Sequence, residues 1–144
     1  MRRLSILLLV AFGATMDGVV FKDIDIVKAG RAIAIDANDT AVIQNTMFQN
    51  IRVEAADEKL IDVETDRPPT FRTAPNTSTV KDVFFTGVSS GVNQLINVHG
   101  ESATVNVNGV HFSGLTVQGQ PVTSQTDTDA TWDINQFVSN ITFQ

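Results

Sequence analysis

Apolar residues along this chain recur in short blocks, and five of the blocks share one internal pattern. An Asn, Asp or Gly stands three residues before a Phe, another stands two residues after it, and an aliphatic residue follows. The Phe residues lie 27, 37, 27 and 31 residues apart, and the last of them carries only the first half of the pattern. They are Phe21, Phe48, Phe85, Phe112 and Phe143. Such self-similarity is typical of repeat architectures.

A second apolar block follows each of the first three Phe blocks. These blocks read AIAID (32–36), LIDVE (60–64) and LINVH (95–99), and each alternates as a half-buried strand does. Asn, Asp and Gly, which tolerate left-handed and tight-turn conformations, separate the extended segments. No helical period persists over more than about two turns. The sequence therefore predicts an all-β protein with at least two short strands per repeat.

Turn chemistry favours a parallel β-helix, or β-solenoid, over propeller blades or hairpins. The dipeptides Asp17-Gly18 and Asn108-Gly109 lie at the entry of the repeated strand rather than between the arms of a hairpin. In a single-stranded parallel β-helix each Phe would stack inside on its equivalent from the next coil. About four to five coils, roughly 4.8 Å apart, would form the domain. A β-sandwich with unrelated core Phe residues is the alternative.

The first fourteen residues, MRRLSILLLVAFGA, have two interpretations. Two Arg, an apolar run from Leu4 to Phe12 and then small residues are the layout of a secretory signal peptide. Apolar runs of this length also form core strands, so the segment could instead be an N-terminal capping strand. We take residues 1–14 as this signal peptide or strand and residues 15–144 as the β-helix domain. Cleavage would place the protein outside the cell or in the cell wall, with no membrane attachment after processing.

Two long intervals between Phe residues predict loops that leave the coils. The segment TDRPPTFRTAPNTS (65–78) holds three of the four Pro residues, which cannot donate to a central ladder. The segment GQPVTSQTDTDATWDINQF (119–137) is polar and carries the only Trp. Loops on one side of a solenoid commonly build its binding face.

Charge and composition exclude several classes of function. Ten Lys and Arg residues against sixteen Asp and Glu give a net charge of −6, and the basic residues are scattered, so nucleic acid is not expected as a partner. The chain has no Cys, hence no disulfide framework and no thiolate metal site. No His cluster or calcium-loop motif is present, so we expect neither a metal nor another cofactor.

Two long stretches resemble a known family. Residues 16–65 and 106–143, from MDGVVFKDIDIV onward and from NVNGVHFSGLTV onward, resemble the C-terminal coils of polygalacturonase-like glycoside hydrolases. The resemblance implies a right-handed parallel β-helix and a pectic or related polysaccharide as partner. Dextranase-type and rhamnogalacturonan-type hydrolases share such coils, so it does not identify the substrate.

The catalytic motifs of the resembled family are absent from the sequence. They are Asn-Thr-Asp, Asp-Asp, Gly-His-Gly and Arg-Ile-Lys, and the nearest fragment is NVHGE (97–101), which has Val98 in place of the first Gly. No catalytic residue can be carried over. We therefore expect the C-terminal portion of such an enzyme, without efficient hydrolysis of its own.

Five residues are candidates for substrate binding: Asp36, Asp62, Glu64, His99 and Trp132. Asp36, Asp62 and Asn97 are expected at equivalent positions along one face, where carboxylates could bind sugar hydroxyls or act as acid and base. A solvated outward face is the interpretation we favour for them. His99 with Glu101 could form an acid/base couple, but an ordinary loop histidine is the interpretation we favour. Trp132 could stack on a sugar, but we favour a role in covering the C-terminal end of the core.

Three functions remain open from the sequence. The first is a polysaccharide-processing β-helix of glycoside hydrolase ancestry that lacks the catalytic carboxylates. The second is a non-catalytic carbohydrate-binding or adhesive β-helix. The third is a small hydrolase, dextranase-like or otherwise, that uses carboxylates such as Asp36, Asp62 and Glu64.

Overall fold

The structure is a computed structural model that describes residues 2–4 and 6–144. Its regular structure is strand throughout, apart from one short 3-10 turn, η1 (Pro69–Phe71). The strands are β1 (Arg2–Leu4), β2 (Leu7–Phe12), β3 (Thr15–Asp17), β4 (Val20–Ile26), β5 (Ala29–Asn38), β6 (Val42–Val53), β7 (Ala56–Glu64), β8 (Thr79–Ser90), β9 (Leu95–His99), β10 (Val107–Ser113), β11 (Thr116–Val117), β12 (Gln120–Pro121), β13 (Thr131–Ile134) and β14 (Val138–Phe143). Among the described residues there is no helix with the length and hydropathy needed to cross a membrane. The all-β prediction is confirmed.

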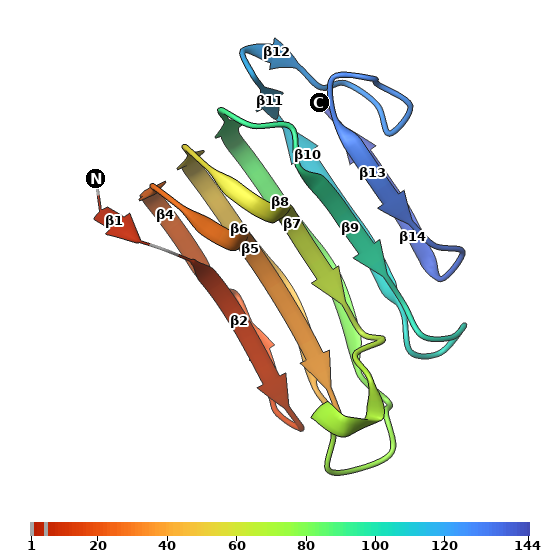
Figure 1. The fold of residues 1–144 in the computed structure, drawn as a ribbon. Helices are drawn as coiled ribbons and strands as arrows, with labels where there is room; N and C mark the ends of the chain where they lie inside the picture. The colour runs from red at the N-terminus through yellow and green to blue at the C-terminus, as the bar shows by residue number, and fades with distance from the viewer. Residues whose placement is uncertain (1, 5) are drawn as a thin grey trace.

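The strands form two parallel sheets that lie one in front of the other (Figure 1). Sheet A has the order β1-β4-β6-β8-β10-β14, with β3 beside β6 and β11 beside β8, and sheet B has the order β13-β9-β7-β5-β2. From β4 to β10 the chain passes alternately from one sheet to the other. Within the described residues the only antiparallel pair is the short one between β11 and β12. Parallel sheets of this kind are compatible with the expected β-helix.

The five Phe residues of the repeat form one continuous column inside the molecule. Neighbouring rings lie 5.0, 5.2, 5.3 and 5.1 Å apart between centroids, with interplanar angles of 7° to 18°. The strands that carry them are in register, as in the pairs of Phe48 with Phe21 and with Phe85. The predicted column is confirmed, and unrelated core positions for these rings are excluded.

The polar residues that flank each Phe adopt left-handed backbone conformations. Their φ angles range from 51° to 97° at the position three residues before Phe and from 52° to 68° at the position two residues after it. The first set is Gly18, Asn45, Asp82, Gly109 and Asn140, and the second is Asp23, Asn50, Gly87 and Gly114. Because Gly, Asn and Asp adopt this conformation most readily, the repeated sequence pattern records a repeated backbone bend.

Replacing Asn50 with alanine should lower the free energy of unfolding by about 1–2 kcal/mol, because an alanine Cβ is strained at a φ of 52°. The Asn50 side chain also donates a hydrogen bond of 2.7 Å to Asp23. Asn50→Gly removes the same side chain without the strain and serves as the matched control. Chemical denaturation measures both variants. An alanine variant as stable as the glycine variant would contradict the assignment of strain.

Sheet B supplies the other wall of the core. The second apolar blocks pair with one another as strands of this sheet, with Ile33 beside Ile61 and Ile61 beside Ile96. All three side chains are buried. Strand β2 continues the sheet in parallel beside β5, with Leu7 paired to Ile33. The strand interpretation of the N-terminal segment therefore has a structural counterpart, while Leu8 and Phe12 on its outer face are 43% and 53% exposed.

Candidate functional site

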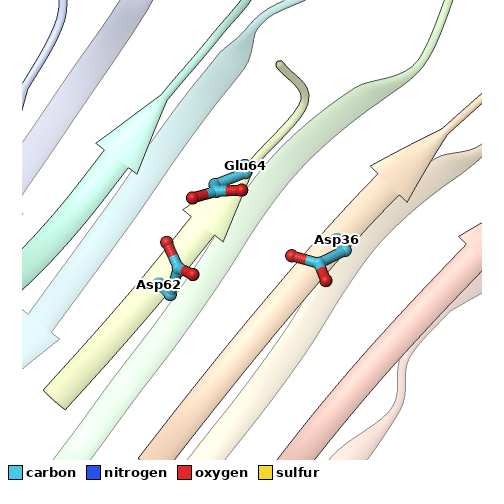
Figure 2. A group of neighbouring side chains, drawn as sticks. All are labelled: Asp36, Asp62 and Glu64. Atoms are coloured by element: carbon cyan, nitrogen blue, oxygen red, sulfur yellow. The ribbon is translucent and has the colours of Figure 1, made fainter. Parts of the chain in front are cut away.

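Four of the five candidate residues lie together on the outer face of sheet B. Figure 2 shows Asp62 and Glu64 on β7 and Asp36 on β5, with their carboxylates on the same side of the sheet. His99 is the register partner of Glu64 on the next strand, β9. The prediction that these acids lie on one face of the sheet is therefore confirmed.

The predicted equivalence of Asp36 and Asp62 is wrong by two residues. Asp36 pairs with Glu64, whereas Asp62 pairs with Ala34 on one side and Asn97 on the other. Residues two apart along a strand lie on the same face. The two-residue shift in register therefore keeps Asp36 and Asp62 on the outer face but places them in different rows of paired residues. One row runs Ala34, Asp62, Asn97, Asp133, and the other runs Asp36, Glu64, His99.

The predicted solvation of this face is also wrong. Asp36, Asp62 and Glu64 are 4%, 0% and 7% exposed, and Asn97 is 4% exposed. Buried carboxylates require partners, because removing an uncompensated charge from water is expensive. The partners come from neighbouring strands and from the loop that follows β7. We call the group formed by Arg31, Asp36, Lys59, Asp62, Glu64, Arg67 and Asn97 the outer cluster.

Two cations from adjacent strands neutralise the acids. Arg31 on β5 donates to Asp62 at 2.8 Å and to Asp36 at 3.2 and 3.3 Å. Lys59 on β7 donates to Asp62 at 3.1 and 3.2 Å and to Glu64 at 2.9 Å. Arg31 and Lys59 are register partners, and both of their charged groups bind Asp62. The side chains of Arg31 and Lys59 are only 19% and 24% exposed, so the surrounding residues hold their charged groups in place.

The loop between β7 and β8 adds a third cation. Arg67 lies 3.6 Å from a Glu64 oxygen and 3.9 Å from an Asp36 oxygen, too far for hydrogen bonds. Its guanidinium lies 4.4 Å from the centroid of the Phe71 ring, and that side chain is 51% exposed. The Pro-rich loop therefore places Arg67 beside the buried acids, with Phe71 next to it.

The environment separates the pKa values of Asp62 and Glu64. Burial acts to raise the pKa of Asp62, but its hydrogen bonds and the charge of Lys59 outweigh burial and lower the pKa. Burial also raises the pKa of Glu64, and here the neighbouring Asp62 adds to the rise beyond what Lys59 offsets. Two adjacent carboxyl groups with opposed shifts are an arrangement typical of acid/base pairs.

His99 extends the cluster toward β13. Its Nδ1 lies 3.3 Å from Asp66 and its Nε2 lies 2.9 Å from Asp133, although the second contact is too poorly aligned for a hydrogen bond. Burial lowers the pKa of His99, but the two carboxylates together raise it above its usual value. The alternative of an acid/base couple with Glu101 is not formed, because Glu101 accepts hydrogen bonds from Arg72 and Asn76 instead.

A divalent cation is not favoured by this donor set. One oxygen from each of Asp36, Asp62 and Glu64 lies within 4.8 Å of the others, which is close enough to share an ion. However, Arg31 and Lys59 already occupy these oxygens through hydrogen bonds. A metal ion would have to displace the charged groups of Arg31 and Lys59 from these oxygens.

Trp132 does not join the outer cluster. It lies on the opposite, inner face of β13 and packs edge-on against Phe112 and Phe143, at 5.5 and 5.7 Å between centroids. This is the position expected of a residue that covers the C-terminal end of the Phe column. Its ring is therefore directed into the core, away from the face that carries the acids.

Sequence reasoning missed the cations Arg31, Lys59 and Arg67. A signal for two of them exists, because Arg31 precedes Asp36 and Lys59 precedes Glu64 by the same five residues in equivalent blocks. Arg67 lies in an irregular loop, for which no periodic pattern predicts a position. Comparisons of this chain with protein-family models, with curated proteins and with solved structures found no match.

Proposed function

We propose that this chain is a right-handed, single-stranded parallel β-helix of polygalacturonase-like ancestry that binds an acidic polysaccharide along the outer face of sheet B. The alternation of the chain between two parallel sheets supports a β-helix of about four to five coils. The right hand follows from the strong preference for right-handed crossovers between parallel strands. As a polysaccharide-binding protein, it would act outside the cell or in the cell wall.

The observation that carries this proposal is that the cations of the outer cluster are more exposed than its acids. The acids are buried below, and Arg31, Lys59 and Arg67 lie above them with more exposure. A polymer that approaches the sheet would meet Arg67, which makes no hydrogen bond to the acids, beside Arg31 and Lys59, which are already bound to them. A uronate carboxylate matches such donors, since guanidinium and ammonium groups bind carboxylates through charge-assisted hydrogen bonds.

Of the three cations in the outer cluster, Arg67 is the one whose N–H donors are available to a ligand. It forms no hydrogen bond of 3.5 Å or less to the acids, so its N–H donors can turn to a bound carboxylate. Phe71 supports the guanidinium from one side and offers a partly exposed aromatic surface next to it. An exposed aromatic beside a cation suits the apolar and charged faces of a uronate sugar.

Binding is favoured over catalysis because the acids are inaccessible. Asp62 has no exposed surface, and oxygens of Asp62 and Glu64 approach within 4.8 Å, less than the roughly 6.5–9.5 Å that inverting hydrolases place between their carboxyl groups. Retaining hydrolysis, at roughly 5–5.5 Å, is the second candidate function. The opposed pKa shifts of Asp62 and Glu64 favour it.

We expect the protein to bind polygalacturonate and not dextran, and Arg67→Ala should weaken binding about 10-fold because a charged hydrogen bond is lost. Affinity electrophoresis or calorimetry measures this, with a rise in salt expected to weaken binding further. Arg52→Ala is the matched control, because Arg52 lies in sheet A and pairs with Asp25 away from the site.

Equal binding by the two variants, or no binding by the unaltered protein, would refute the proposed site. The same samples should be assayed for new reducing ends. Release of reducing ends that is lost in Glu64→Gln would establish the second candidate in place of the first.

A further inference from the structure

A second group of chemically active side chains lies on the outer face of sheet A. His111 on β10 contacts Thr142 on β14 through Nδ1 at 2.7 Å, and Asp82 on β8 through Nε2 at 2.9 Å. Three neighbouring strands therefore contribute one residue each to a continuous chain of hydrogen bonds. None of these residues belongs to the outer cluster, which lies on the other sheet.

The chemistry of the partners fixes the direction of these hydrogen bonds. An ionised carboxylate only accepts, so neutral His111 must carry its proton on Nε2 and donate it to Asp82. Its Nδ1 is then an acceptor, and the Thr142 hydroxyl donates to it. A hydroxyl that donates to an imidazole, which is in turn oriented by a carboxylate, is the arrangement of an activated nucleophile.

The local backbone is built to permit this contact. Asp82 and Gly109 occupy equivalent left-handed positions, with φ angles of 51° and 97°. A Cβ on Gly109 would overlap Oδ1 of Asp82 and lie 3.1 Å from Nε2 of His111. Only glycine at this position leaves the space through which Asp82 reaches the imidazole.

The His111 imidazole also packs face-on against an aromatic ring and borders a cavity. It stacks on Phe84, its register partner on β8, at 4.8 Å between centroids and an angle of 25°. A cavity of about 220 Å³ adjoins His111 and Thr142, with Phe84, Phe112, Ser113 and Gln144 among its lining residues. Its mixed aromatic and polar walls suit a short acyl group.

The residue that follows Thr142 supplies a backbone donor at the edge of the sheet. Gln144 donates its N–H to Phe112 on β10, and adjacent residues in a strand direct their N–H groups to opposite edges. Phe143 therefore directs its N–H to the outer edge of β14, where no strand of the described chain pairs with it. The amide after the nucleophile is a common donor to the oxyanion of an acyl-transfer intermediate.

We propose that Thr142, His111 and Asp82 act as nucleophile, general base and orienting acid in the hydrolysis of short-chain carboxylic esters. Thr142 Oγ1 attacks the ester carbonyl and passes its proton to His111 Nδ1, and the resulting tetrahedral intermediate expels the alcohol, which takes that proton. Water then attacks the acyl-threonine, again losing a proton to His111. The carboxylic acid leaves, and Thr142 regains its proton. Asp82 accepts the Nε2–H throughout, and no other reactant is required.

Hydrolysis of 4-nitrophenyl acetate by the purified protein tests this proposal. Thr142→Val and His111→Gln should each lower kcat/KM by about 100-fold or more, as expected when a nucleophile or general base is lost. Asp82→Asn should lower it as well, whereas Thr142→Ser should retain most of the activity. Thr128→Val is the matched control, because Thr128 is exposed in the loop before β13 and lies outside the relay.

A covalent readout separates catalysis from a structural role. Acid quenching during turnover followed by peptide mass analysis should find one acetyl group on Thr142, and none on the peptide from Thr142→Val. Circular dichroism checks that each variant is folded, and Thr142, being exposed, can be replaced without disturbing the core. Wild-type rates in Thr142→Val, acetyl groups on His111 or lysines instead, or hydrolysis no faster than by free imidazole would overturn the proposal.

Discussion

Replacing Phe85 with alanine should lower the free energy of unfolding by about 3–5 kcal/mol, the range for a large aromatic side chain deleted from a core. Phe85 is fully buried at the centre of the column and stacks on both Phe48 and Phe112, at 5.2 and 5.3 Å. Alanine removes both contacts and leaves a cavity that the parallel strands on either side can fill only by moving together. Urea denaturation followed by fluorescence or circular dichroism measures the loss.

Two further variants separate burial from ring stacking. Phe85→Leu retains most of the buried apolar volume but no ring, so it should cost about 1–2 kcal/mol. Phe71→Ala removes a ring that is 51% exposed and should cost less than about 1 kcal/mol. An alanine variant at position 85 that is as stable as the variant at position 71 would show that the column does not hold the two sheets together.

The fold was predictable because its determinants are local and repeated. Every Phe of the column except the last has a left-handed residue on both sides, and only a few residue types adopt that conformation readily, so the pattern around Phe48 is repeated around Phe85 and Phe112. Alternation within the second blocks gives the inner and outer faces of sheet B in the same way. The N-terminal segment was ambiguous because a short apolar run has no period that separates a leader from a strand.

The site was predictable only in part. Period-two alternation places Asp36, Asp62 and Glu64 on the outer face, but it does not say what covers that face. Lys59 binds Asp62 and Glu64 on its own strand, but Arg31 reaches Asp62 and Arg67 reaches Asp36 through tertiary contacts between segments about 30 residues apart. An outward acid that is solvated and one that is buried in an ion-pair network have the same sequence pattern. Burial of the acids therefore could not be derived from their positions.

Replacing Asp62 with asparagine should lower the free energy of unfolding by about 3 kcal/mol at neutral pH, because removing one partner of a buried ion-pair network leaves its cations uncompensated. Asp62 accepts hydrogen bonds from Arg31, Lys59 and Asn97, and its side chain has no exposed surface. An asparagine side chain keeps the volume of Asp62 but directs its N–H donors toward Arg31 and Lys59, which are donors themselves. Asp57→Asn is the matched control, since the Asp57–Lys28 pair is exposed at 3.7 Å and should contribute less than about 1 kcal/mol.

The difference between wild type and Asp62→Asn should itself depend on pH. The pKa of Asp62 is lower in the folded protein than its ordinary value of 3.8, so the stabilisation by its charge is fully present above that value. It should be lost as the pH falls through the lowered folded-state pKa, and the two denaturation curves should converge there. Glu64 is present in both proteins, but its pKa is raised in part by Asp62, so a change in its titration also contributes to the difference. A difference that stays constant from pH 7 to strongly acidic pH would show that Asp62 stabilises the fold by its shape rather than by its charge.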